Sequence, residues 1–135
     1  MAAIAWSREF EIGVPEIDAQ HQHLVEIVNR FEEARARGKA TRVLGEILKE
    51  LIGYTQEHFA FEEGYMHKVE YSGLKLHQAK HRQLIAKVER FQFDFDQGRR
   101  ISIEIHDFLK YWLLNHIQED DKAITTAGEP AATPA

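Results

Sequence analysis

The sequence predicts an all-α protein, an up-down-up-down four-helix bundle with an extended N-terminal arm. Three observations support this. Apolar residues recur every three or four positions in four separate segments, which is the period of one face of a helix. Glycines and polar residues typical of helix ends separate these segments. The connections are short, which favours antiparallel neighbours. We therefore expect helices over about 18–37, 41–65, 73–97 and 102–122.

The expected order along the chain is an arm over residues 1–16, the bundle over 17–124 and a disordered tail over 125–135. Gly13 and Pro15 interrupt regular structure in the arm, and its apolar residues are expected to pack on the bundle. The tail is rich in Ala, Thr, Pro and Gly, so it cannot bury enough apolar surface to become ordered.

Local sequence predicts where the helices end. Asp18 is the predicted N-cap of the first helix, and Gly38 is predicted to end that helix in the left-handed conformation. Gly98 is predicted to close the third helix, and Ser102 to cap the fourth. Helices of about 20 to 25 residues are about 30 to 38 Å long, because each residue rises about 1.5 Å.

Composition limits the possible functions. The 135 residues are 44% hydrophobic, which is enough for a single core without disulfides. The net charge is −5 and basic residues form no run, which argues against a nucleic-acid partner. The absence of cysteine excludes thiolate ligands and a cysteine nucleophile. Charges at Arg8, Glu9 and Glu11 interrupt any leader, so we expect a cytoplasmic monomer with no membrane span.

Potential metal ligands lie on the apolar faces of all four expected helices. His58 and Glu62 are four residues apart, as are His77 and His81, so each pair projects two donors from one helix face. Because the apolar faces converge, these side chains are expected to meet in the core. Two metal ions fit this number of donors better than one. The predicted ligands are His21, His58, Glu62, His77, His81, His116 and Asp121.

Each ligand also has a simpler interpretation. A single histidine on an apolar face is more often a hydrogen-bonded core residue, and a His–Glu pair four residues apart can be a surface pair. The spacing of His77 and His81 lacks the glutamate that a zincin helix requires. Together, however, these groups would be buried with no metal to offset a desolvation cost of several kcal/mol for each uncompensated charge. The combination therefore favours a metal site.

The other histidines are interpreted as surface groups, and two further acids lie beside predicted ligands. His23, His67 and His106 are expected to be exposed or to cap helices. Glu63 directly follows a predicted ligand, as Asp120 directly precedes one. α-Helical spacing from the last histidine would favour Asp120 as the ligand, so the choice of carboxylate there stays open.

These motifs resemble those of the hemerythrins, and specifically of the single-domain bacteriohemerythrins. The resemblance rests on GVPEIDAQHQHL at 13–24, HFAFEE at 58–63, HQAKH at 77–81 and WLLNHIQEDD at 112–121. It covers about residues 6–122 and includes every predicted ligand in order and spacing.

The resemblance implies two iron ions, Fe²⁺ or Fe³⁺, bridged by an oxo or hydroxo group. One iron is assigned the histidines His77, His81 and His116. The other iron is assigned His21 and His58, and the bridging carboxylates are Glu62 and Asp121. The family spacing thus selects Asp121 over its neighbour.

The resemblance also implies that dioxygen binds reversibly at one iron, in a pocket that Trp112 and Leu113 line. We therefore expect oxygen carriage, storage or delivery to an oxygen-consuming enzyme, and no catalysis by this chain. The histidine-rich ligand set agrees, because carboxylate-rich di-iron oxidases use four carboxylates and two histidines. Three alternatives stay open: a di-iron enzyme acting on peroxide or nitric oxide, oxygen sensing through a separate partner, and iron buffering.

Overall fold

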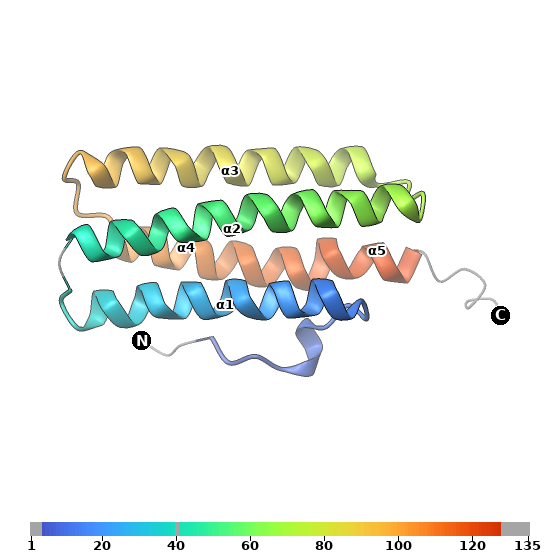
Figure 1. Ribbon diagram of the computed structural model, residues 1–135, viewed down its shortest axis with the longest axis horizontal. Helices are drawn as coiled ribbons and strands as arrows, with labels where there is room; N and C mark the ends of the chain where they lie inside the picture. The colour runs from blue at the N-terminus through green and yellow to red at the C-terminus, as the bar shows by residue number, and fades with distance from the viewer. Residues whose placement is uncertain (1–3, 40, 128–135) are drawn as a thin grey trace.

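Four long helices lie side by side along one axis in the computed structural model, which describes residues 4–39 and 41–127 (Figure 1). The helices are α1 (Pro15–Ala36), α2 (Thr41–Lys68), α3 (Leu74–Asp96) and α4 (Ser102–Asn115). After α4 the chain stays helical through a π-helical segment (His116–Asp121) and α5 (Lys122–Ala127). The predicted four-helix bundle is confirmed. None of the described helices is long and apolar enough to span a membrane.

The first helix begins earlier than expected. Pro15 is its first residue, a position that suits proline because the ring fixes φ and the missing N–H would have no partner there. The prediction of Asp18 as N-cap is wrong. Its carboxylate instead accepts hydrogen bonds from the backbone N–H groups of Ile12 (2.7 Å) and Gly13 (3.2 Å), where Gly13 has a φ of 94°. Asp18 thereby ties the arm to the first helical turn.

The N-terminal arm lies along α1, with one 3₁₀ turn at Arg8–Phe10 (Figure 1). The backbone N–H of Ile4 donates to the side chain of Asn29 (2.8 Å), whose amide donates back to the Ile4 carbonyl (2.9 Å). Phe10 and Ile12 are buried. The arm therefore contributes to the core, as the sequence predicts.

The other helix ends follow the sequence in part. Gly38 and Gly98 have φ values of 69° and 90°, as expected of residues that end helices. The prediction of Ser102 as N-cap is wrong, because α4 already begins there and the N–H of Ile105 bonds the carbonyl of Ile101 (2.9 Å). The expected tail begins too early, since 125–127 belong to α5; the rest of it, 128–135, lies outside the described residues.

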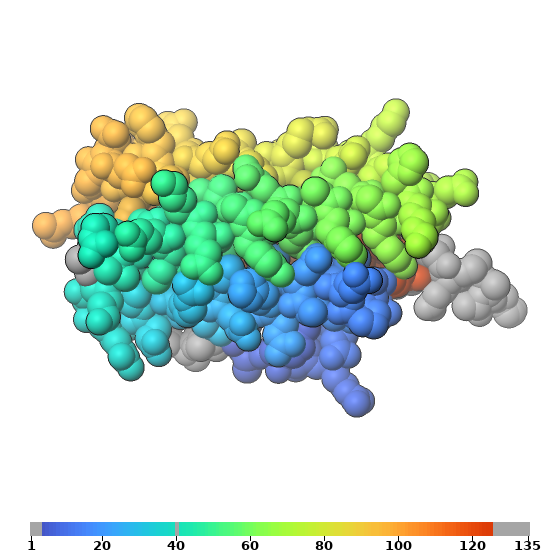
Figure 2. Space-filling view, in the orientation of Figure 1, coloured from blue at the N-terminus to red at the C-terminus, as the bar shows by residue number. Residues whose placement is uncertain are grey.

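The core runs along the whole bundle. Figure 2 shows α2 in the middle of one face, between α1 and α3, with side chains filling the spaces between them. Burying one large apolar side chain stabilises a fold by about 1.5 to 3 kcal/mol. Fully buried apolar residues come from α1, α2, α4 and the π-helical segment, and they include Ile27, Phe31, Leu48, Met66, Ile105 and Ile117. This core holds the helix faces that carry the polar cluster in fixed register.

Candidate metal centre

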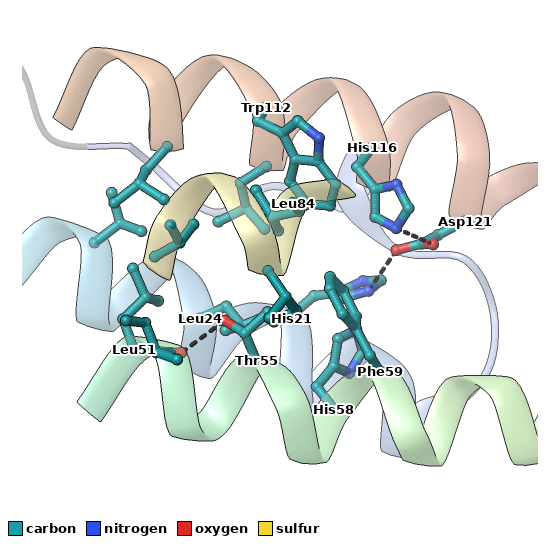
Figure 3. Close-up of a pocket in the computed structure, with 16 residues that line it drawn as sticks. His21, Leu24, Leu51, Thr55, His58, Phe59, Leu84, Trp112, His116 and Asp121 are labelled. Carbon is teal, nitrogen blue, oxygen red and sulfur yellow. Dashed lines mark hydrogen bonds and ion pairs between the residues drawn. The ribbon is translucent and has the colours of Figure 1, made fainter. Parts of the chain in front are cut away.

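All seven predicted ligands meet at one point inside the bundle, and every one of them is buried. They come from α1 (His21), α2 (His58 and Glu62), α3 (His77 and His81) and the last helix (His116 and Asp121). Their ligand atoms form two groups, each within 4.8 Å, and the two carboxylates belong to both groups. Figure 3 shows His21, His58, His116 and Asp121 around this point.

Glu62 lies between the two groups of histidines. Its Oε1 atom is 3.0 Å from Nε2 of His81 and 3.2 Å from Nε2 of His77. Its Oε2 atom is 3.4 Å from Nε2 of both His21 and His58. The carboxylate therefore presents one oxygen to each group.

Asp121 repeats this arrangement from the opposite helix. Its Oδ1 atom is 2.8 Å from Nε2 of His77 and 3.0 Å from Nε2 of His116. Its Oδ2 atom is 2.8 Å from Nε2 of His21. Two carboxylates that each face two sets of histidines are suited to bridge a pair of cations.

The π-helical segment explains why Asp121 faces inward and Asp120 does not. In an α-helix residues four apart share a face, whereas a π-helical turn brings residues five apart together. Asp121, five residues after His116, therefore lies in the central cluster. Asp120 lies outside it, where it accepts a hydrogen bond from Nδ1 of His116 (2.9 Å) and pairs with Nζ of Lys80 (2.6 Å).

Three of the five histidines have an outer hydrogen-bond partner that holds Nε2 toward the centre. The pairs are His58 Nδ1 with Gln20 Oε1 (2.6 Å), His81 Nδ1 with Glu63 Oε2 (2.7 Å) and His116 Nδ1 with Asp120 Oδ2 (2.9 Å). Sequence reasoning missed these roles: it noted only that Glu63 and Asp120 lie beside predicted ligands and could be mistaken for them. The sequence did contain one indication of these roles, because Glu63 directly follows Glu62 and Asp120 directly precedes Asp121.

Opposite charges offset burial for some of these groups, whereas burial lowers the pKa of His58. Burial acts to lower the pKa of His21, but the carboxylates of Asp121 and Glu62, 2.8 and 3.4 Å from its Nε2 atom, raise it to about 9. Burial and the charge of Glu62 act to raise the pKa of Asp121, but the charge and hydrogen bonds of His116 lower it on balance. Without a metal, the buried anions thus depend on protonated imidazoles for compensation.

Most of the donor atoms point at a common centre rather than at one another; the exception is Nε2 of His81, which lies 3.2 Å from Nε2 of His116. Although nitrogen and oxygen lie as little as 2.8 Å apart, several fully buried atoms have no partner at a hydrogen-bonding angle. They include Nε2 of His21, His58 and His77 and both carboxylate oxygens of Glu62 and Asp121. Each unpaired buried polar group costs about 1 to 3 kcal/mol. Cations at the centre would satisfy all of them, so the residues present fit a pair of metal ions.

An apolar cavity adjoins the cluster. Its volume is about 20 Å³, by the measure in which one water molecule needs about 10 to 15 Å³. Trp112 and Leu113 line it, as expected, and Trp112 stacks on His116 with ring centroids 4.3 Å apart. Further wall residues include Val28, Val88 and Leu109. Figure 3 labels five more of them, Leu24, Leu51, Thr55, Phe59 and Leu84. The cavity can hold one small uncharged molecule beside the centre.

The remaining histidines lie away from the cluster. His67 is exposed and His23 is partly exposed, as expected. The prediction for His106 is wrong, because this residue is completely buried. It precedes the buried Leu109 by three residues, so it shares the inner face of α4. Its Nδ1 atom lies 3.5 Å from Oε1 of Glu32, which Arg35 holds with two hydrogen bonds.

The bundle buries five histidines and two carboxylates at one point, a donor set that fits a histidine-rich site for two metal ions. Residues 12–127 match the family model of the hemerythrin HHE cation binding domain, and the chain belongs to the hemerythrin family. The resemblance drawn from the motifs is thereby confirmed.

Individual relatives agree with this assignment. The bacteriohemerythrin of Stenotrophomonas maltophilia is 36% identical over 123 residues, which cover 91% of this chain and 80% of that protein. The myohemerythrin of Riftia pachyptila is 31% identical over 86% of both chains. The crystal structure of a wild-type hemerythrin matches with a TM-score of 0.86 and 31% identity, over 93% of this chain and 97% of that one.

Proposed function

We propose that this protein binds dioxygen reversibly at a centre of two iron ions, as an oxygen carrier or store rather than an enzyme. The observation that carries the proposal is the apolar cavity directly beside a buried, histidine-rich cluster of donors that lack partners. Membership of the hemerythrin family supports iron as the metal. Delivery to an oxygen-consuming enzyme is a use that fits the same site.

In this proposal the two iron positions differ in their ligands. The three-histidine position consists of His77, His81 and His116, and the two-histidine position of His21 and His58. Glu62 and Asp121 bridge the two positions. The two-histidine position thus has one protein ligand fewer and more room for an external ligand. When bound, two ferrous ions supply the two electrons that dioxygen accepts.

The lining of the cavity also supports binding of the external ligand at the two-histidine position. Both histidines of the two-histidine position line it, whereas only His116 does so from the other position. Apart from the metal-ligand side chains and Thr55, the walls are apolar, which admits a small uncharged molecule and disfavours water. Thr55 carries a hydroxyl in the wall, but that hydroxyl already donates to the carbonyl of Leu51 (2.6 Å). A wall that withholds protons favours release of dioxygen over further reaction.

The test is to load the metal-free protein anaerobically with two equivalents of ferrous iron and to cycle it between oxygen and inert gas. A visible absorption band that appears under oxygen and vanishes under inert gas over several cycles is expected. Protein loaded with zinc should show no band, because Zn²⁺ is not redox-active and cannot reduce dioxygen. Irreversible formation of a ferric product, with turnover of added peroxide or nitric oxide, would replace the proposal with an enzymatic function.

A further inference from the structure

The hydrogen bonds behind the histidines differ between the two iron positions. In the three-histidine position, His81 and His116 each donate Nδ1–H to a carboxylate, Glu63 at 2.7 Å and Asp120 at 2.9 Å. In the two-histidine position, His58 donates to the neutral amide of Gln20 at 2.6 Å. Nδ1 of His21 is buried and has no hydrogen-bond partner. Carboxylates therefore accept the outer N–H groups of histidines in the three-histidine position and not in the two-histidine position.

This difference changes the strength of the ligands. A carboxylate that accepts the outer N–H of an imidazole increases electron density on the ring, so the inner nitrogen becomes a better donor to a metal. A neutral amide does this less, and an imidazole without a partner gains nothing. Removing such an outer partner typically weakens metal binding by about 10-fold to 100-fold.

Both outer carboxylates are also held in place by a second neighbour. Nζ of Lys80 donates to Oδ1 of Asp120 (2.6 Å), and the amide of Gln78 donates to Oε1 of Glu63 (3.2 Å). Each carboxylate thus keeps one oxygen on its histidine. This fixes the imidazole orientation as well as its donor strength.

We propose that Glu63 and Asp120 are positioning residues that make the two iron positions unequal. Through their hydrogen bonds the three-histidine position binds its iron more tightly and stabilises the ferric over the ferrous ion. The two-histidine position therefore releases its iron first. This inference rests on the proposed di-iron function. Ligand number alone predicts the same order, so the test must change the outer bonds and leave the ligands intact.

The experiment follows loss of iron from the ferrous protein under anaerobic conditions, in excess 2,2′-bipyridine, which forms a coloured ferrous complex. Two phases are expected. Glu63→Gln and Asp120→Asn keep an oxygen that can accept the N–H but remove the charge, so they should speed the slow phase by about 10-fold to 100-fold and leave the fast phase within about twofold. The midpoint reduction potential of the loaded protein should rise in both variants.

Gln20→Glu is the reverse test. It places a carboxylate behind His58, so it should slow the fast phase by about 10-fold and lower the reduction potential. A destabilised or misfolded variant would not release iron more slowly than the unaltered protein. Slower release therefore distinguishes a change in donor strength from a loss of stability.

Asp94→Asn is the matched control for Asp120→Asn. Its carboxylate is similarly sheltered, with 19% of the side chain exposed against 24% for Asp120, and it likewise pairs with basic side chains. It lies near the far end of α3 and touches no ligand, so neither phase should change.

Several results would overturn the inference: a single phase in the unaltered protein, a slow phase that changes less than threefold in Glu63→Gln and Asp120→Asn, or the same acceleration in Asp94→Asn. Uptake of fewer than two irons would overturn both this inference and the proposed function. Two firmly held irons that do not respond to oxygen would overturn the proposed function alone, because the release assay uses no oxygen.

Discussion

Replacing Leu113 with alanine should open the cavity to water without removing a ligand. Leu113 is buried in the cavity wall, close to the centre. A buried Leu→Ala change lowers the free energy of unfolding by about 2 to 5 kcal/mol, because the transfer free energy is lost and a void remains. The existing volume of about 20 Å³ already reaches the size that one water needs. The enlarged cavity would hold more than one water.

Water that enters would find hydrogen-bond partners, because His21, His58 and Asp121 also line the cavity. We therefore expect Leu113→Ala to keep two irons per chain but to lose its capacity to rebind dioxygen several times faster. The assay counts iron, then follows the reversible absorption band over repeated oxygen cycles at fixed temperature and oxygen pressure.

Two controls separate hydration from loss of stability. Leu113→Met roughly conserves volume, so it should cost less than about 1.5 kcal/mol and leave the decay rate unchanged. Leu48→Ala removes a fully buried leucine that does not line the cavity, so it should lose similar stability with normal decay. The reasoning is refuted if Leu113→Ala decays at the unaltered rate, or if Leu48→Ala decays just as fast.

Three further predictions concern the centre itself. His77→Ala should lower both iron content and melting temperature; two full irons with unchanged melting would contradict its place among the ligands. Removing iron with a chelator should lower the melting temperature and adding it back should restore it, since binding and folding are coupled. Burial lowers the pKa of His21, but the nearby carboxylates of Asp121 and Glu62 raise it to about 9 on balance, so the metal-free protein should be stabilised below pH 6.5 and lose that stability toward pH 9, measured by urea unfolding. A pH-independent midpoint over that range would contradict this.

The sequence predicts the fold and the cluster because both follow from regular helices. His58 with Glu62, and His77 with His81, lie four residues apart in unbroken helical segments, so spacing alone places each pair on one face. The start of α1 was harder to predict, because Pro15 can end regular structure or begin a helix and only the neighbouring backbone decides which.

The outer partners could not be predicted in the same way. The bond from His58 to Gln20 joins residues 38 apart, and it depends on how α1 and α2 are rotated against each other. Nδ1 of the buried His106 lies 3.4 Å from Oδ1 of Asp107 on its own helix and 3.5 Å from Oε1 of Glu32 on α1, and spacing along the chain does not reveal the second contact. Periodicity indicates faces, whereas contacts between helices require the packed structure.

The π-helical segment lets a single helix hold one imidazole from both sides. Asp121 faces Nε2 of His116 while Asp120 faces Nδ1, and an α-helix brings only one residue to the position four after the histidine. The π-helical turn differs from an α-helical turn by one additional residue, which one codon encodes. Deleting one between Ile117 and Glu119 would leave a single acid to serve both nitrogens. Asp121 would then be the fourth residue after His116 in an ordinary α-helix, so the residues downstream, including the buried Ile124, would keep their faces. The number of residues between His116 and Asp121, more than the identity of those residues, therefore decides which carboxylate meets which nitrogen.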